Sequence, residues 1–229
     1  MFELADVHAV YGRSRVLHGV SLRAGEGEVV ALLGRNGAGK STTLKAIVGV
    51  VEVTAGDIRF EGRSLRGVPT HRVARLGIGL VPEDRRIFAD LTVAENLLVG
   101  ARPDSGWTVD RVFGLFPKLA ELARQRGGSL SGGEQQMLTI ARTLMTGPRL
   151  LLLDEPSEGL APVVVAALAE NVAALKRQGL TILMAEQNVK FARRLTDRAY
   201  IIEKGQIRFE GTMATLDADE SLRRAYLSV

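Results

Sequence analysis

The spacing of apolar residues divides the chain into strand-like and helix-like stretches. In roughly the first sixty residues, short apolar runs predict strands at Phe2–Val7, Val16–Leu22, Val29–Leu33 and Asp57–Phe60. The run from Val29 to Leu33 has no polar alternation, so we expect both of its faces to be buried in a sheet. A glycine-rich loop follows, and then we expect a helix from Ser41 to Val48 that ends at Gly49, because glycine is favoured just past a helix end.

Helical spacing dominates the middle of the chain. The segments Val93–Val99 and Val109–Phe116 repeat their apolar residues at helical intervals. Glycine and proline in residues 102–106, and the glycine pair at 127–128, separate these segments from their neighbours. We therefore predict an α-helical subdomain, from about residue 84 to about residue 145, inserted into a larger domain.

Strands and helices alternate again in the last third. The pattern predicts a strand at Leu150–Leu153, a helix at Pro162–Lys176, a strand at Leu180–Ala185, and a closing hairpin from Ala199–Glu203 to Gln206–Phe209. This alternation is typical of an α/β fold with a mixed, mainly parallel sheet. With the short strands before residue 60 as an antiparallel β part, we expect one domain that spans residues 1–229.

Composition narrows the class of protein. The chain has 229 residues, of which 46% are hydrophobic, enough to bury the core of one globular unit. It contains no run of about 18 apolar residues, and its first residues lack a secretory signal, so we expect neither a membrane span nor secretion. The absence of cysteine excludes disulfides and cysteine-bound zinc.

The net charge of +4 is compatible with an anionic partner. The basic residues, however, are scattered in short pairs such as Arg85-Arg86 and Arg193-Arg194. No aromatic side chains alternate with them, as a stacking platform for nucleic acid would require. We interpret these pairs as solvated surface, and we expect no nucleic-acid partner.

Residues 34–41 match the pattern G-x-x-x-x-G-K-S directly after the predicted buried strand. In this motif backbone N–H groups surround a polyphosphate, Lys40 supplies a cation, and the Ser41 hydroxyl binds Mg²⁺. An ordinary glycine-rich turn is the weaker interpretation because the complete motif is present, although the loop alone fits a kinase or a GTPase equally well. The predicted nucleotide-binding residues here are Gly34, Arg35, Asn36, Gly37, Ala38, Gly39, Lys40, Ser41 and Thr42.

Two carboxylates end the apolar run at residues 150–153. Asp154 is expected at the C-terminal edge of a strand, where doubly wound sheets bind their ligands, and can hold Mg²⁺ through water. Glu155, beside it, is our candidate general base for a water aligned on the γ-phosphate. Without the glycine-rich loop, a simple polar end to the strand would be the preferred interpretation.

The segment Ser131-Gly132-Gly133-Glu134 has two compatible interpretations. Its S-x-x-E pattern is a capping box for a helix that starts at about Gln135. The free N–H groups and positive dipole end of such a helix also suit a γ-phosphate.

Together, the three segments in this order resemble the ATP-binding-cassette ATPases. The resemblance implies a P-loop NTPase core, ATP and Mg²⁺ as cofactors, and a head-to-tail dimer in which Ser131, Gly132, Gly133 and Glu134 bind the γ-phosphate held by a second ATPase subunit. It also implies that Tyr11 stacks on adenine, with a surface tyrosine of a hairpin as the competing interpretation. Glu83 stands where the family usually has glutamine near Mg²⁺, and would still offer an oxygen ligand.

Two other positions depart from the family pattern. Gln187 stands where the family usually has its switch histidine. Ala161, in the loop that follows Asp154 and Glu155, stands where the family usually has an aspartate. Glutamine can donate a hydrogen bond to the γ-phosphate but carries no positive charge, so we expect altered turnover with Gln187 still in a catalytic role.

Four segments together resemble the ATP-binding subunits of bacterial branched-chain amino-acid importers: Val81–Phe88, Leu130–Leu138, Asp154–Pro162 and Glu186–Asn188. The similarity extends from Tyr11 to the closing Ala225–Val229. Asp84 differs from the glycine expected there. The resemblance implies a cytoplasmic subunit, peripheral on the inner face of the membrane, that powers uptake with transmembrane permease subunits and, indirectly, a solute-binding protein. A urea or amide importer, a regulatory cassette with little turnover, and a soluble cassette acting on DNA or ribosomes are the alternatives; the last would normally need a long insertion or a second cassette.

Overall fold

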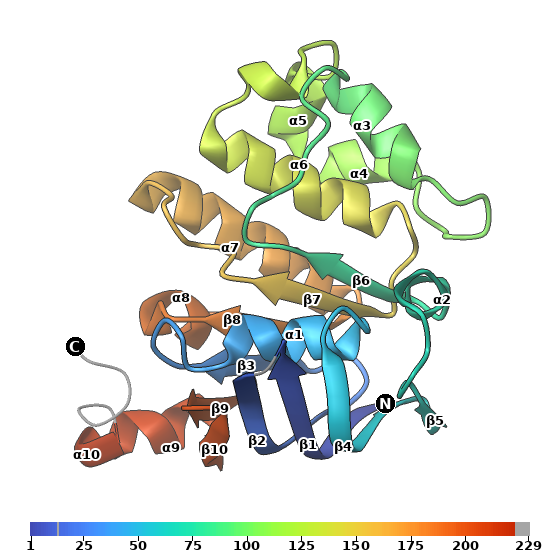
Figure 1. Ribbon diagram of the computed structural model, residues 1–229. Coiled ribbons are helices and arrows are strands. Elements are labelled where there is room, and N and C mark those ends of the chain that lie inside the picture. Colours follow the sequence, from blue (N-terminus) through green and yellow to red (C-terminus); the bar gives the residue numbers. More distant parts are fainter. Residues whose placement is uncertain (13, 223–229) are drawn as a thin grey trace.

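Two β-sheets and a group of helices make up the structure, a computed structural model that describes residues 1–12 and 14–222 (Figure 1). The segment Ala225–Val229, named above for its resemblance, lies outside the described residues. In chain order the elements are β1 (Phe2–Tyr11), β2 (Ser14–Ala24), β3 (Val29–Leu33), α1 (Lys40–Ile47), β4 (Glu52–Phe60), β5 (Arg63–Ser64), α2 (Thr70–Arg75), β6 (Ile78–Val81), α3 (Val93–Gly100), α4 (Val109–Leu115), α5 (Pro117–Glu121), a 3-10 turn (Gly127–Ser129), α6 (Gly132–Leu144), β7 (Leu150–Asp154), α7 (Pro162–Arg177), β8 (Thr181–Glu186), α8 (Val189–Arg193), β9 (Arg198–Glu203), β10 (Gln206–Gly211), α9 (Met213–Ala218) and α10 (Glu220–Leu222).

The larger sheet has the strand order β10-β9-β3-β8-β7-β6. All its neighbouring strands are parallel except β10, which pairs antiparallel with β9. The register sets Leu33 opposite Glu186, Asp154 opposite Ala185, and Val81 opposite Leu153. Because parallel strands end at the same edge, the residues that follow β3, β6, β7 and β8 gather there.

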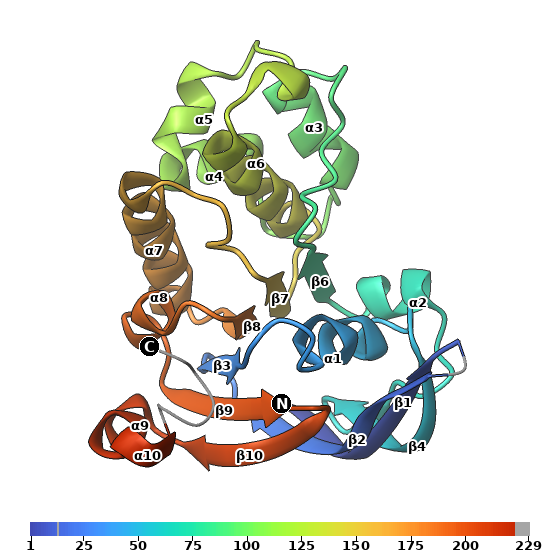
Figure 2. The same cartoon turned by 60° about the vertical axis from the view of Figure 1, so that its left-hand side comes forward.

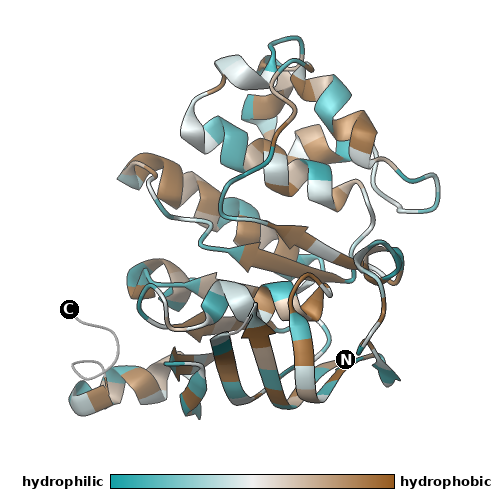
Figure 3. Ribbon diagram, in the orientation of Figure 1, coloured by the Kyte–Doolittle hydropathy of each residue, from teal (hydrophilic) through white to brown (hydrophobic). Residues whose placement is uncertain are grey.

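The larger sheet is covered on both sides, as expected for Val29–Leu33. Alternate residues of β3 point into different cores, with Val29, Ala31 and Leu33 in one and Val30 and Leu32 in the other, and all five are fully buried. Helices α6 and α7 belong to the first core, and α1 and the smaller sheet to the second. The strands of the larger sheet form the apolar centre of the molecule in Figure 3.

The smaller sheet is antiparallel, with the order β2-β1-β4-β5. Its strands are longer than predicted: β1 continues to Tyr11 and β4 begins at Glu52. Pairing between strands overrides the polar residues that ended the predicted strands, because β1 pairs with both β2 and β4. Figures 1 and 2 both show α3 to α6 as a separate group at the end of the molecule farthest from this sheet.

These findings confirm the predicted fold class. A mainly parallel core, an antiparallel β part near the N-terminus and an inserted group of helices are all present. The strand β6 was not predicted, because its four residues include a glycine and carry little pattern. The predicted ends of the domain and of the helical subdomain remain predictions.

Candidate functional site

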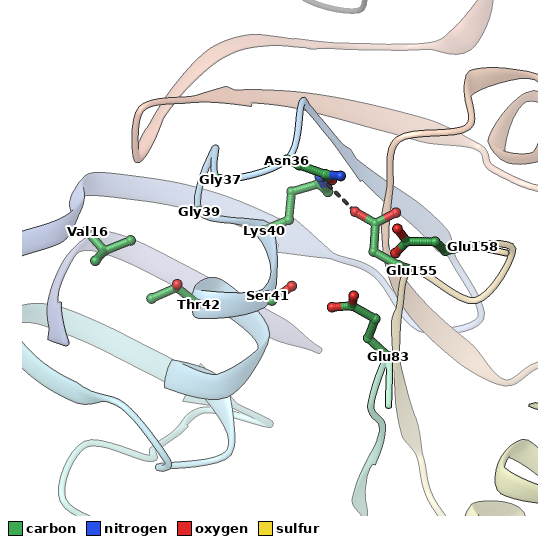
Figure 4. Close-up of a pocket in the computed structure, with 10 residues that line it drawn as sticks. All are labelled: Val16, Asn36, Gly37, Gly39, Lys40, Ser41, Thr42, Glu83, Glu155 and Glu158. Atoms are coloured by element: carbon green, nitrogen blue, oxygen red, sulfur yellow. Dashed lines mark ion pairs between the residues drawn. The ribbon is translucent and has the colours of Figure 1, made fainter. Parts of the chain in front are cut away.

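A pocket of about 450 Å³ opens where the P-loop meets the ends of β6 and β7 (Figure 4). Three carboxylates, one lysine and the start of α1 surround it. The residues that line it are Val16, Asn36, Gly37, Gly39, Lys40, Ser41, Thr42, Glu83, Glu155 and Glu158. The structure thus brings together residues that are more than a hundred positions apart in the chain, from Asn36 to Glu158.

Lys40 is buried and fully engaged within the protein. Its Nζ lies 2.8 Å from Glu155 Oε1 and donates to the carbonyl oxygens of Gly34 at 2.8 Å and Arg35 at 3.0 Å. Lys40 is 4% exposed and Glu155 is 8% exposed, so solvent screens this ion pair little. A polyphosphate entering the pocket would therefore compete with Glu155 for the ammonium group.

Glu155 is oriented by two contacts. One carboxylate oxygen meets Lys40, and the other accepts a hydrogen bond from the backbone N–H of Gln187 at 3.2 Å. Its backbone lies in the left-handed region, with φ of 46°, which residues other than glycine seldom adopt. This turn directs the side chain into the pocket rather than along the strand (Figure 4).

Ser41, which lines the pocket, is hydrogen-bonded to Asp154 at the end of β7. The Ser41 hydroxyl donates to Asp154 Oδ1 at 2.8 Å. Burial raises the pKa of the Asp154 carboxyl, while the Ser41 hydrogen bond and Lys45 act in the opposite direction. A hydroxyl, a carboxylate and the nearby Glu83 side chain offer the oxygen atoms that Mg²⁺ prefers, so these residues fit such an ion.

The glycines of the loop fit a bound polyphosphate. Gly37 and Gly39 have φ of 79° and 113°, conformations that favour glycine. Gly34 is held against β9, because a Cβ there would collide with the carbonyl oxygen of Ile202. The loop thus turns tightly above β3 and leads directly into α1, whose first residue is Lys40.

Two further carboxylates near the ends of β7 and β8, Glu158 and Glu186, were not predicted. Glu158 lines the pocket, and its pKa is raised by partial burial and by the carboxylates of Glu83 and Glu155. Glu186 is 1% exposed and accepts hydrogen bonds from the N–H groups of Ser157 at 3.0 Å and Asn188 at 2.9 Å; burial raises its pKa. The position of Glu186 at the end of an apolar strand was the available signal, as it was for Asp154.

The segment from Ser131 to Glu134 forms the predicted capping box. The Ser131 hydroxyl accepts from the Glu134 N–H at 3.4 Å, and Glu134 Oε2 accepts from the Ser131 N–H at 2.8 Å. A Cβ at Gly133 would collide with Val164 of α7, so this glycine lets the two helices meet. None of these residues, nor Tyr11, lines the pocket described above.

Tyr11 ends β1, opposite Ser14 in the hairpin, and is 59% exposed. The exposed side chain is available for a ligand. In residues 1–12 and 14–222, no helix is long and apolar enough to cross a membrane.

Comparison with known proteins supports the same family. The sequence pattern of the ABC transporter family matches residues 17–158. The chain is 46% identical over 231 residues to the high-affinity branched-chain amino acid transport ATP-binding protein BraG of Pseudomonas aeruginosa, covering 99% of each. It is 32% identical to a probable branched-chain amino acid transport ATP-binding protein LivF of Archaeoglobus fulgidus, covering 100% of this chain and 99% of that protein.

Another relative, the lipopolysaccharide export system ATP-binding protein LptB of Escherichia coli, is 37% identical, with 95% of this chain and 92% of that protein covered. Among solved structures, the ADP conformation of an ATP-binding cassette of an ABC transporter superposes with a TM-score of 0.83 at 27% identity, covering 98% of this chain and 97% of that one. Fold, pocket and relatives agree: the chain belongs to the ABC transporter family and is an ATP-binding-cassette ATPase.

Proposed function

We propose that this ATPase powers a membrane importer of branched-chain amino acids and hydrolyses Mg²⁺-bound ATP in the pocket around Lys40. The observation that carries the nucleotide site is the pair of contacts that joins the P-loop to the end of β7: Lys40 to Glu155, and Ser41 to Asp154. The extent of identity to BraG supports the class of solute.

The roles of the pocket residues follow from their chemistry. Lys40 binds the β- and γ-phosphates, and the backbone N–H groups of residues 34–42 surround them. Ser41, Asp154 and Glu83 are the proposed Mg²⁺ site, and the ion, when bound, offsets negative charge on the phosphates. Glu155, released from Lys40 by the phosphates, is the proposed general base for the attacking water. Gln187 offers its side-chain amide to the γ-phosphate.

The remaining proposed contacts come from the surface and from a second subunit. Tyr11 is exposed at the end of its hairpin, which is compatible with stacking on adenine. Ser131, Gly132, Gly133 and Glu134 form the capped start of α6 outside the pocket of their own chain. This arrangement supports a head-to-tail dimer, with a like or related cassette, in which each α6 binds the phosphate held by the other subunit.

Three exposed apolar side chains support docking to a transmembrane permease. Phe88, Leu98 and Val99 are 46%, 58% and 55% exposed. They belong to α3 and the segment before it, in the helical part of the molecule. Docking there would hold the subunit at the cytoplasmic face of the membrane, with the solute-binding protein acting on the other face.

The solute is tested by uptake in native cells whose only copy of this chain carries Glu155→Gln. We expect loss of labelled leucine uptake while labelled urea uptake continues, with the wild-type chain restoring the former. Loss of urea uptake alone would assign the chain to a urea or amide importer. If neither is lost, the importer proposal fails, whereas the ATPase assignment is tested separately on the purified chain.

A regulatory role with little turnover is the other alternative, and Gln187 motivates it. If the wild-type chain hydrolyses ATP no faster than the Glu155→Gln variant, that alternative is correct. A Lys40→Ala variant that still binds ATP as tightly as wild type would contradict the assignment of the pocket.

A further inference from the structure

Side chains of α6 form hydrogen bonds with the backbone of residues 82–88, the segment that carries Glu83. Thr139 Oγ1 lies 2.8 Å from the carbonyl oxygen of Arg85 and 2.9 Å from that of Gln135, so its single hydrogen is shared between these two acceptors. Arg142 Nη2 donates to the carbonyl oxygen of Arg86 at 2.7 Å and to that of Arg85 at 3.5 Å. The Arg85 side chain lies against the start of the same helix, because a Cβ at Gly132 would come within 2.8 Å of its Nη1. Residues 85 and 86 are thus fixed to α6.

The turn that α6 holds is strained. Arg85 and Arg86 have φ of 59° and 49°, so two successive non-glycine residues lie in the left-handed region. Such conformations persist only where the surrounding structure imposes them, and they are frequent near functional sites. Here the donors on α6 are the groups that fix both carbonyl oxygens.

A contribution to the stability of the fold does not by itself explain why an arginine occupies position 142. Its Nη1 is buried without a hydrogen-bond partner among the described residues, which destabilises the folded state. Burial also lowers the pKa of its guanidinium. The group lies 5.0 Å from the ring centre of Phe88, the exposed residue at the end of the same segment.

We propose that Arg142 is a positioning residue for ATP hydrolysis. By holding the turn at Arg85 and Arg86, it fixes where Glu83, two residues earlier, stands at the pocket. This inference rests on the proposed role of Glu83 beside Mg²⁺. Among the described residues, the hydrogen bonds and the ring contact of Arg142 go to Arg85, Arg86 and Phe88 rather than to the lining of the pocket, so Arg142 acts through the backbone of the segment.

The test is Arg142→Met, which keeps much of the side-chain volume and removes the donors. We expect kcat to fall between about ten- and about a hundredfold, as for small displacements of groups at an active site. The KM for ATP should change little, because Lys40 and the P-loop are untouched. The Mg²⁺ concentration for half-maximal activity should rise, and the thermal midpoint should stay near that of the wild type.

Arg111→Met is the matched control. Arg111 also lies over an aromatic ring, that of Trp107 at 4.0 Å, and also donates to a backbone carbonyl, that of Gly106 at 2.8 Å. It belongs to α4 in the same group of helices, and its side-chain hydrogen bonds go to Gly106 and Gln178 rather than to residues 82–88. We expect its kcat and Mg²⁺ dependence to match the wild type.

Two further variants protect the test against a folding defect. Arg142→Lys keeps one donor for the Arg86 carbonyl, so it should have a higher kcat than Arg142→Met. Thr139→Val removes the hydroxyl that contacts the Arg85 carbonyl, so it should shift the Mg²⁺ dependence in the same direction as Arg142→Met. If these variants lower the thermal midpoint but leave kcat and the Mg²⁺ dependence at wild-type values, the positioning role is refuted.

A double-mutant cycle with Glu83→Ala separates this inference from the proposed metal site. If Arg142 acts through Glu83, adding Arg142→Met to Glu83→Ala should cause little further loss of kcat. If Glu83→Ala itself leaves the Mg²⁺ dependence unchanged, the proposed metal role of Glu83 fails. If Glu83→Ala alters it and Arg142→Met does not, only the role of Arg142 fails.

Discussion

At the scale of single residues, the central feature of the pocket is the buried ion pair between Lys40 and Glu155. Both groups are nearly fully buried, and Lys40 also has two backbone carbonyl partners. Such a pair would be costly to break without a replacement, because either charge alone would remain buried. The phosphates of ATP provide that replacement for Lys40, which links binding of the substrate to release of Glu155.

Glu155→Gln separates the two effects of this pair. Turnover should fall by about two to four powers of ten, because a general base is lost. Affinity for ATP should be equal to or tighter than that of wild type, because the amide competes less strongly for Lys40. Single-turnover hydrolysis and equilibrium binding measure the two quantities on the same protein. A loss of affinity similar in size to the loss of turnover would contradict this account.

Glu186 gives the fold a dependence on pH. Burial raises its pKa above the ordinary value of 4.5, so folding favours the protonated form. Its stabilising contribution is complete below that value and is lost as pH rises through the higher folded pKa. In a Glu186→Gln variant, the thermal midpoint relative to wild type should therefore increase as pH rises from about 4.5 towards neutrality. A difference that is constant with pH would show that the carboxyl does not titrate in this way.

At the scale of elements, α6 contacts two parts of the site. Its first turn meets α7 at Gly133 and Val164, and the segment before α3 at Gly132 and Arg85. Helix α7 follows the loop of Glu155 and Glu158, and residues 82–88 follow β6. Any movement of α6 relative to the larger sheet would therefore reach both sides of the pocket.

Gly133→Ala tests the contact between α6 and α7. The new Cβ would collide with Val164, so we expect the free energy of unfolding to fall by about 1 to 3 kcal/mol. Adding Val164→Ala should recover part of that loss. Gly114→Ala is the control, because Gly114 lies in α4 with no atom near the new Cβ, and helix propensity alone should stabilise it by up to about 1 kcal/mol. Urea denaturation of the four proteins measures these differences, and equal effects at both glycines would exclude the collision.

At the scale of the whole molecule, the pocket and the start of α6 are separate surfaces of one chain. Tyr11 and Ser131–Glu134 lie outside the set of residues that line the pocket. The proposed dimer makes one complete site from the P-loop of one subunit and α6 of the other. Two defects placed in different subunits would then spare one site in a mixed dimer.

Mixing Lys40→Ala chains with Ser131→Arg chains tests this arrangement. Each variant alone should have almost no ATPase activity, and the mixture should regain a clear part of the wild-type rate, because the mixed dimer keeps one site with both halves intact. The control is a mixture of Lys40→Ala with Lys40→Met chains, which cannot complement. If the wild-type chain alone turns over and the first mixture stays inactive, the head-to-tail arrangement is wrong.

The features that could be predicted from the sequence are those set by residues close together in the chain. The strand before Gly34, the helix predicted from Ser41, the run ending in Asp154 and the cap at Ser131 all have local signals, and the structure has each of them, with the helix beginning one residue earlier, at Lys40. The ion pair between Lys40 and Glu155 was not predicted, since the two residues are far apart in the chain. Glu158 and the contacts of Arg142 were not predicted, because their neighbours come from the register of β6, β7 and α6 rather than from any repeating pattern.

The double burial of β3 has a consequence for how the molecule opens. Its backbone is hydrogen-bonded to β8 on one side and β9 on the other, and both of its faces are covered. Amide hydrogens in Val29–Leu33 can exchange with solvent only when both layers come apart, so they should be among the slowest in the chain. The P-loop is thus attached to the most persistent part of the protein, and the subunit can lose order at its periphery while the support beneath the phosphates stays intact.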